Sequence, residues 1–310
     1  MIHFRRSNAA LNSNCRTQRP RAIPRVEVLE HRALLSGYSF SRVDAPGFTT
    51  TNYGINDSGQ IVGFFREAGK RGHGFLRARM GAFTTIDAPG AATTSALKIN
   101  RAGQIAGTFM DAGNKFHGFL RAPTGAFTAI DIPGAIGTFV QGINDAGQVV
   151  GAFTKPDSDY TQPDGGVQPF LPHGFLRTAT GALTTFGVPG AANTTAINSP
   201  GQIVGTFMDA RNKFHGFLRA PTGAFSTIEV PVPGATGTHA FGINDSGQIV
   251  GFFGEVAKGH GFVRTETGVF TTIDVPGAIQ THALGINGSG QIVGVFEDAG
   301  AKHHGFVATR

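Results

Sequence analysis

Cysteine is almost absent from this sequence: Cys15 is the single cysteine among 310 residues. It lies within residues 1–37, so the rest of the chain can form neither a disulfide framework nor a thiolate metal site. Charged residues are also scarce, at 15%, whereas glycine contributes 46 residues. That glycine content is about twice the usual share of ~7% and favours short strands joined by tight turns, because glycine adopts positive φ without steric cost.

Long apolar runs and helical periodicity are missing too. No stretch contains about 18 consecutive apolar residues, so the sequence predicts no membrane-spanning helix. No segment repeats its apolar residues with the period of an α-helix, which predicts that helices are effectively absent. Residues 1–37 also lack the apolar core of about 7–15 residues that a conventional secretory signal needs.

Positive charge is unevenly distributed along the chain. The net charge is +6, of which residues 1–37 contribute +5. The remaining 273 residues carry 19 basic and 18 acidic groups. A region so nearly neutral lacks the one-signed field that phosphate backbones require, and we therefore predict no nucleic-acid partner for it. Nucleic-acid binding by the basic tail stays open as an alternative.

What the chain has in abundance is repetition. The motif Gly-Gln, then Ile or Val, then Val or Ala, then Gly occurs at 59–63, 103–107, 147–151, 201–205, 247–251 and 290–294. His-Gly-Phe follows each copy, at His73, His117, His173, His215, His260 and His304. A third element that leads to Pro-Gly begins at Phe40, Phe83, Phe127, Leu183, Phe225 and Phe270. Each unit divides into four short antiparallel strands, the size of a β-propeller blade.

The sequence therefore predicts an all-β fold, a six-bladed β-propeller over residues 38–310. Small residues precede most Ile-Asn pairs, as the crowded innermost strands require: Gly54, Gly142, Ala196, Gly242 and Gly285. The last unit has no fourth strand of its own, whereas an extra one precedes the first unit. We predict that strand 38–44 pairs with the last blade and closes the ring, removing an unpaired edge. An open β-solenoid is the alternative.

The repeat resembles a known family. Gly-Ile-Asn-x-x-Gly-Gln-Ile-Val-Gly followed by His-Gly-Phe is similar to the bacterial extracellular HAF repeats, over residues 38–310. The resemblance implies an exported, propeller-like protein and supplies no functional residues. The segment VEVLEHRALLSG at 26–37 resembles the Leu-Glu-Pro-Arg-x-Leu-Leu-Ser segment of planctomycete-type surface proteins, with His31 in place of proline. It implies that residues 1–37 form a basic export or sorting tail, which we expect to be disordered.

Ligand-binding positions are expected where propellers usually bind, at the mouth of the axial channel. Counting four residues back from each Ile of Ile-Asn gives a polar and asymmetric set: Thr51, Ser95, Phe139, Asn193, His239 and His282. The inner strands supply no carboxylate, and a glycosidase-type mechanism needs a pair of them. This argues against catalysis. A carbohydrate-active or lactonase-like enzyme with its site at the channel is the competing interpretation, and an unoccupied channel lining is a further one.

The insertion at 154–172 breaks the symmetry of the repeats. Loops carried on a rigid scaffold often hold binding function, so Tyr160, Asp157 and Asp159 are candidate contacts to a sugar or to Ca²⁺. A tolerated insertion is the alternative. We expect the repeated histidines to bond a neighbouring strand rather than bind metal, and the lysines at the blade tips to form a solvated rim beside their acids.

These patterns predict a non-catalytic scaffold or recognition module with no metal and no cofactor, Ca²⁺ at the insertion being the alternative. The resemblance to the HAF repeats and to the surface-protein segment implies a place at the cell surface or outside the cell. Polysaccharide or cell-surface components are the expected partners, and we expect a monomer. An intracellular interaction platform is the third interpretation.

Overall fold

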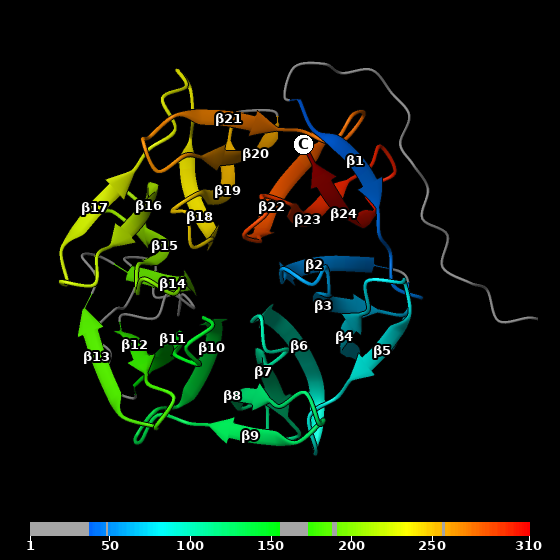
Figure 1. Cartoon of the computed structure of the whole chain (residues 1–310), viewed down its shortest axis with the longest axis vertical. Helices are drawn as coiled ribbons and strands as arrows, with labels where there is room; N and C mark the ends of the chain where they lie inside the picture. Colours follow the sequence, from blue (N-terminus) through cyan, green and yellow to red (C-terminus); the bar gives the residue numbers. More distant parts are fainter. Residues whose placement is uncertain (1–36, 48, 156–172, 188–190, 256–257) are drawn as a thin grey trace, which may run out of the picture.

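The computed structural model describes residues 37–47, 49–155, 173–187, 191–255 and 258–310. All regular secondary structure in these ranges is β-strand, in 24 strands. The strands form a ring of sheets around a central axis, with one strand of each repeat nearest the axis (Figure 1). No helix in the described ranges is long and apolar enough to cross a membrane.

Each repeat contributes strands in the same order outward from the axis. The innermost strands are β2 (Thr49–Ile55), β6 (Ala91–Ile99), β10 (Gly137–Ile143), β14 (Ala191–Ile197), β18 (Gly237–Ile243) and β22 (Gln280–Ile286). The second strands are β3 (Ile61–Arg66), β7 (Ile105–Asp111), β11 (Val149–Thr154), β15 (Ile203–Met208), β19 (Ile249–Gly254) and β23 (Ile292–Glu297). The third are β4 (Gly72–Arg77), β8 (Phe116–Arg121), β12 (His173–Arg177), β16 (Phe214–Arg219), β20 (Gly259–Arg264) and β24 (His303–Thr309). The outermost are β5 (Phe83–Ile86), β9 (Phe127–Ile130), β13 (Leu183–Gly187), β17 (Phe225–Ile228), β21 (Phe270–Ile273) and, for the last repeat, β1 (Ser39–Arg42).

The number of sheets differs from the prediction. Six separate blades are predicted, whereas the described strands form five hydrogen-bonded sheets, four of them four-stranded and one eight-stranded. The eight-stranded sheet combines the last two repeats, because one parallel pair, Gly259 with Gln280, joins β20 to β22. A Cβ on Gly259 would lie 3.3 Å from Oε1 of Gln280 and 2.3 Å from the Phe252 ring, so glycine leaves room for both side chains.

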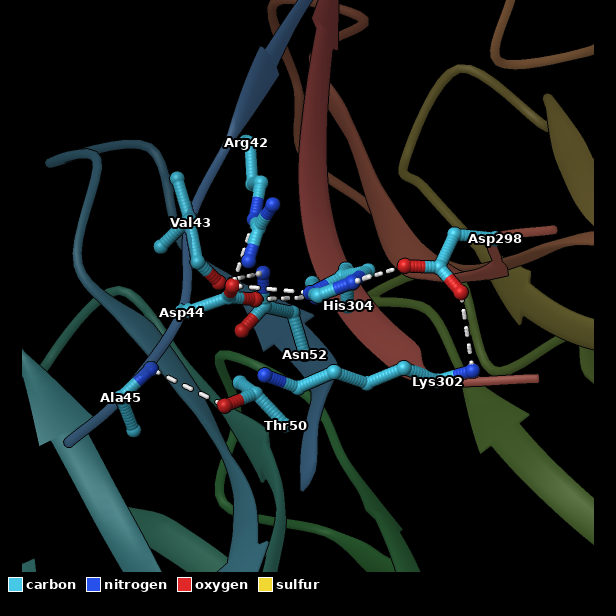
Figure 2. A network of polar contacts seen from close by, with 10 residues as sticks. Arg42, Val43, Asp44, Ala45, Thr50, Asn52, Asp298, Lys302 and His304 are labelled. Carbon is cyan, nitrogen blue, oxygen red and sulfur yellow. Dashed lines mark hydrogen bonds and ion pairs between the residues drawn. The ribbon is translucent and has the colours of Figure 1, made fainter. Parts of the chain in front are cut away.

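The predicted closure of the ring is confirmed. Strand β1 pairs antiparallel with β24, with Phe40 opposite Ala308. Asp44, just after β1, accepts a hydrogen bond from the backbone N–H of Gly305 at 3.0 Å and contacts Nδ1 of His304 at 2.9 Å (Figure 2). The other ring nitrogen of His304 lies 3.0 Å from Asp298. Residues from the two ends of the repeat region are thus tied together by sheet pairing and by a buried histidine.

Phenylalanine and glycine of the two main motifs fit together in the core. Phe75 of His-Gly-Phe lies opposite Gly63 of Gly-Gln-Ile-Val-Gly and is 1% exposed. A Cβ on Gly63 would lie 2.1 Å from the carbonyl oxygen of Thr51 and 2.6 Å from the Phe75 ring. Glycine is therefore required at this position so that the buried ring can pack on the backbone. The apolar core lies between neighbouring sheets, as where Ile55 and Phe75 of the first repeat meet Val293 of the last.

A closed ring of asparagine side chains joins all the repeats. Each asparagine of Ile-Asn donates from Nδ2 to the backbone carbonyl of the equivalent asparagine in the next repeat, at 3.0–3.2 Å. The last member, Asn287, donates to Asn56 and completes the circle. We call this set the asparagine ring: Asn56, Asn100, Asn144, Asn198, Asn244 and Asn287.

The glutamine four residues later completes the bonding of each amide. In the first repeat Asn56 also donates to Oε1 of Gln60 at 2.8 Å, and its Oδ1 accepts the backbone N–H of Gln60 at 3.0 Å. Every member of the ring repeats both contacts with its own glutamine. The spacing Asn-x-x-Gly-Gln is therefore a requirement of one hydrogen-bonded unit rather than of a turn alone.

The first prediction concerns this ring. Replacing Asn56 by Ala removes three side-chain hydrogen bonds: the N–H and Oε1 of Gln60 lose their contact with it, and the buried carbonyl of Asn100 keeps only the N–H of Gly103. We expect the free energy of unfolding to fall by about 2–4 kcal/mol. Urea unfolding of Asn56→Ala measures this, with Ser58→Ala, an exposed side chain in the same turn, as the control. Equal unfolding midpoints for the two variants would contradict the structural role of the ring.

The second prediction concerns the closure. Backbone N–H donation from Lys302, together with His304, lowers the pKa of Asp298 from 3.8 to about 2. A carboxylate whose folded-state pKa is depressed stabilises the fold above its unfolded pKa, and this stability is lost as the pH falls from about 4 to about 2. In Asp298→Asn the charge is absent. We expect its stability deficit, measured by urea unfolding, to be full at pH ~6 and to shrink toward pH ~2; a deficit independent of pH would count against the mechanism.

Candidate functional site

A small cavity lies on the axis at the end where the inner strands finish. Its volume is about 100 Å³, and the Ile-Asn pairs of the inner strands form most of its wall. The amides of the asparagine ring donate to the backbone carbonyls of the next repeat and to their own glutamines, so the ring forms a fixed wall around the cavity. Next to the asparagine ring the inner strands pack closely against one another: a Cβ on Gly285 would lie 2.8 Å from the Tyr53 carbonyl oxygen.

Lys98 is the one lysine on an inner strand and lines this cavity. It occupies the position that is Gly or Ala in the other repeats. Its Nζ donates to the backbone carbonyls of Tyr53 at 3.0 Å and Leu284 at 2.5 Å, so it bridges three neighbouring repeats. Burial lowers the pKa of Lys98 from 10.5 to about 7. With this pKa the ammonium group is only partly protonated near pH 7.

Three carboxylates stand at the entrance to the cavity, which corrects the expectation of an axial site without acids. The inner strands themselves carry none, but Asp57, Asp145 and Asp245 come directly after them and line the cavity. Each Oδ1 accepts a backbone N–H from the turn of a neighbouring repeat, at 2.7–2.8 Å. The acids occur in alternate repeats, with Arg101, Ser199 and Gly288 between them.

The six positions predicted to bind a ligand lie near the opposite end of the inner strands, and none of them lines the cavity. Counting back from Ile assumed a regular alternation of side chains. A β-bulge interrupts every inner strand, as between Asn52 and Gly54, and changes which way the preceding residues point. All six side chains are half-buried: Thr51, Ser95, Phe139, Asn193, His239 and His282.

These six side chains do not converge on one site, and each contacts residues near it. Asn193 accepts a hydrogen bond from Nε2 of Gln141 in the preceding repeat at 2.9 Å. The hydroxyl of Thr51 bonds the phenol of Tyr53, although burial still raises the pKa of that phenol. Phe139 packs against Phe116 with ring centroids 4.8 Å apart.

His239 and His282 form the one cluster within the set. The His282 ring lies 4.0 Å from the Phe252 ring, between centroids, and His239 lies 4.8 Å from Phe214 and 5.9 Å from Phe241. Burial lowers the pKa of both histidines from 6.5 to about 4, and for His282 the charge of His239 adds to the shift. Both imidazoles are therefore neutral near pH 7. We call His239, His282, Phe214, Phe241 and Phe252 the aromatic cluster.

The repeated His-Gly-Phe histidines contact neighbouring strands of their own sheets, as predicted. Each described ring packs against a phenylalanine of the second strand, for example His117 on Phe109 at 5.0 Å. Five of them contact an acid at the end of the outermost strand, such as His117 with Asp131 at 2.9 Å. In the described ranges no three His, Cys, Asp or Glu side chains converge in a way that could hold a metal ion.

Lysines at the tips pair with acids, as the predicted solvated rim requires: Lys70 with Glu67, Lys213 with Glu229, and Lys258 with Asp274. Tyr160, Asp157 and Asp159 lie outside the described residues.

Sequence reasoning missed three features that have visible signals. Lys98 departs from a position that is otherwise glycine or alanine. The alternate Asn-Asp turns mark the acids of the cavity. The recurring arginine after His-Gly-Phe-Leu or His-Gly-Phe-Val marks a further set of charges, described below.

The third prediction uses the aromatic cluster. Between pH 6.5 and 4 the unfolded chain protonates His239 and His282 whereas the folded chain does not, so stability falls as the pH falls through this window. The loss is at most about 1.4 kcal/mol per pH unit for each imidazole. Urea unfolding at pH ~7, ~5.5 and ~4.5 should show a flatter profile for His239→Gln/His282→Gln than for the wild type. Parallel profiles would show that these imidazoles are not buried as described.

No protein-family model and no curated protein sequence matches the chain. Solved structures do match it in fold. A gluconolactonase from Xanthomonas campestris superposes with a TM-score of 0.53 at 14% identity, covering 93% of this chain and 95% of that one. Streptogramin B lyase gives 0.51 at 13%, covering 88% and 98%, and the fucose-specific lectin from Aleuria aurantia gives 0.51 at 11%, covering 83% and 91%. At these identities the likeness shows the fold alone: the chain is a β-propeller built from four-stranded antiparallel units.

Proposed function

We propose that this protein is a non-catalytic recognition module that binds carbohydrate at the aromatic cluster. The observation that carries the proposal is the set of phenylalanine rings around His239 and His282, two imidazoles that are neutral near pH 7. Small-molecule sites combine apolar and aromatic walls with a few placed polar groups. Uncharged ring nitrogens can donate to or accept from a sugar hydroxyl, while the phenylalanine faces pack against the sugar ring.

The scaffold suits this role because hydrogen bonds fix the inner strands that carry the two histidines. The asparagine ring, the closure by β1 and the sheet pairing fix the inner strands from which His239 and His282 project. A preorganised site loses little conformational entropy on binding. The lectin among the similar folds binds fucose by its name, and this supports the capacity of the architecture without transferring the ligand.

A competing function has its own observation. Asp57, Asp145 and Asp245 line the axial cavity, and carboxylates around a channel are what a hydrolase of the lactonase or glycosidase type would need. Each of them is engaged by a neighbouring backbone N–H, which favours a structural role for these acids in joining the turns.

A location at the cell surface or outside the cell is part of the proposal. It is supported by the resemblance of the repeats to the HAF family and of residues 26–37 to a surface-sorting segment.

The fourth prediction tests the proposed binding. The full chain should bind a subset of neutral glycans on an array, and the double variant His239→Ala/His282→Ala should lower that affinity at least tenfold. Met80→Ala, an exposed side chain away from the cluster, should leave it unchanged. Repeating the screen with calcium present and then chelated shows whether an ion is involved.

Two outcomes would overturn the proposal. Absence of binding in both conditions would leave a structural scaffold. Hydrolysis of a lactone or glycoside by the wild type, lost in Asp145→Asn, would establish the competing enzyme.

A further inference from the structure

Arginines gather on one face of the ring. In five repeats the third strand ends in arginine, and each of these pairs with the first residue of the second strand, as Arg77 does with Ile61. This register places them at the same end of the sheets as the asparagine ring. The five are Arg77, Arg121, Arg177, Arg219 and Arg264.

The charge of this face differs from that of the opposite one. We call it the basic face: the turns between first and second strands, the turns between third and fourth strands, and the strand ends beside them. Its described basic residues are Arg77, Arg79, Arg101, Arg121, Arg177, Arg219, Arg264 and Arg310, and its acidic side chains are Asp57, Asp145, Asp245 and Glu266. At the tips of the other face, lysines and three arginines (Arg66, Arg71 and Arg211) are interspersed with acids, and Lys98 lies on the axis.

The arginines of the third strands are held in place by aromatic rings rather than by acids. Four guanidinium groups lie over a phenylalanine of the outermost strand, as Arg77 does over Phe83 at 6.0 Å from the ring centroid. Within the described residues no ion pair involves any of the five. Burial lowers the pKa of Arg77, and the guanidinium keeps its charge. A fixed, partly desolvated cation is the arrangement from which an anionic ligand gains most.

A groove on the same face brings Arg77 together with Arg79, an arginine of the turn that follows the third strand. It has a volume of about 480 Å³ and lies between the first and last repeats. Arg77, Arg79, Asp57 and Ser58 line it from one side, and Gln291 and Thr309 line it from the other. We call it the seam groove.

The topology explains why the groove occurs here. In the first five repeats a tight turn with a positive-φ glycine, such as Gly81, joins the third strand to the fourth. In the last repeat these strands are β24 and β1, which are not joined by a turn.

We propose that the seam groove binds an acidic sugar unit of a polysaccharide, with Arg77 and Arg79 holding its carboxylate or sulfate group. Arginine presents a planar fork that matches both anions. Ser58, Gln291 and Thr309 offer hydroxyl and amide groups for the sugar hydroxyls. This site lies on the opposite face from the aromatic cluster, and its function does not depend on binding there.

The same features disfavour a nucleic acid as the occupant. Asp57 lines the groove, and Asp145 and Asp245 lie further toward the axis, so a continuous phosphate backbone would meet repulsion between its arginine contacts. An acidic sugar can place one anion against Arg77 and Arg79 and direct neutral hydroxyl groups toward the carboxylate.

Isothermal titration of the full chain tests the proposal with four probes. These are a sulfated heparin-type hexasaccharide, its desulfated and N-acetylated form, a galacturonic acid hexamer, and a single-stranded DNA oligomer of matching charge. We expect binding of at least one of the sulfated and galacturonate probes, weakened at least tenfold in Arg79→Gln and in Arg77→Gln/Arg79→Gln. The single variant keeps Arg77 on Phe83, so it separates loss of binding from loss of folding, which urea unfolding checks.

Matched controls make the result specific. Arg211→Gln removes an arginine from the opposite face and should change affinity less than twofold; His239→Ala/His282→Ala should do the same, which separates this site from the one proposed above. Equal affinity of the wild type and Arg79→Gln for every anionic probe would overturn the proposal. Arginine-dependent binding of the DNA oligomer at equal or higher affinity would overturn it in favour of a nucleic-acid partner, and absence of binding to any anionic saccharide would overturn it outright.

Discussion

The asparagine ring is the constraint on which the rest of the structure depends. Each amide uses Nδ2 to reach the next repeat and its own glutamine, and Oδ1 to accept that glutamine's backbone N–H. Backbone carbonyls of the same asparagines accept both the amide of the preceding repeat and the N–H that closes the turn, as Asn56 accepts from Asn287 and Gly59. A small polar side chain with two donors and one acceptor is required six times over, and this is why the motif recurs so faithfully.

Closure of this ring couples distant parts of the chain. A solenoid with the same repeats would lack one of the six asparagine-to-asparagine hydrogen bonds, so the terminal amide would keep only its own glutamine and the terminal carbonyl only the N–H of its turn. Here Asn287 reaches Asn56, and the β1–β24 pairing with the Asp44–His304 contact secures the outer edge at the same place. The inner hydrogen bonds and the outer strand therefore close the ring at two different radii.

Features that every repeat shares could be predicted from the sequence, whereas features that depend on contacts between neighbouring repeats could not. Strand order, the all-β character of the described residues and the pairing of the strand before the first repeat with the last repeat follow from motif spacing and strand alternation. The joining of two repeats into one sheet does not, because it rests on a single contact between Gly259 and Gln280. The residues that line the axial cavity were also not predicted. Counting back from Ile assumes regular alternation of side chains, and a bulge in each inner strand breaks that alternation. Lys98 could have been found, as a lysine where the other repeats have glycine or alanine.

The distribution of charge over the surface was not predicted from the sequence either. A region with 19 basic and 18 acidic groups has almost no net field at a distance, and on that ground the prediction that the repeats bind no nucleic acid was reasonable. Net charge is a sum, however, whereas a binding surface depends on where the charges lie. The register of the third strands places the arginines at their ends on the basic face. On the opposite face, lysines of the tip loops pair with acids. Because the closed ring holds both ends rigidly apart, these opposite arrangements cannot neutralise each other, and a nearly neutral chain presents two chemically different faces.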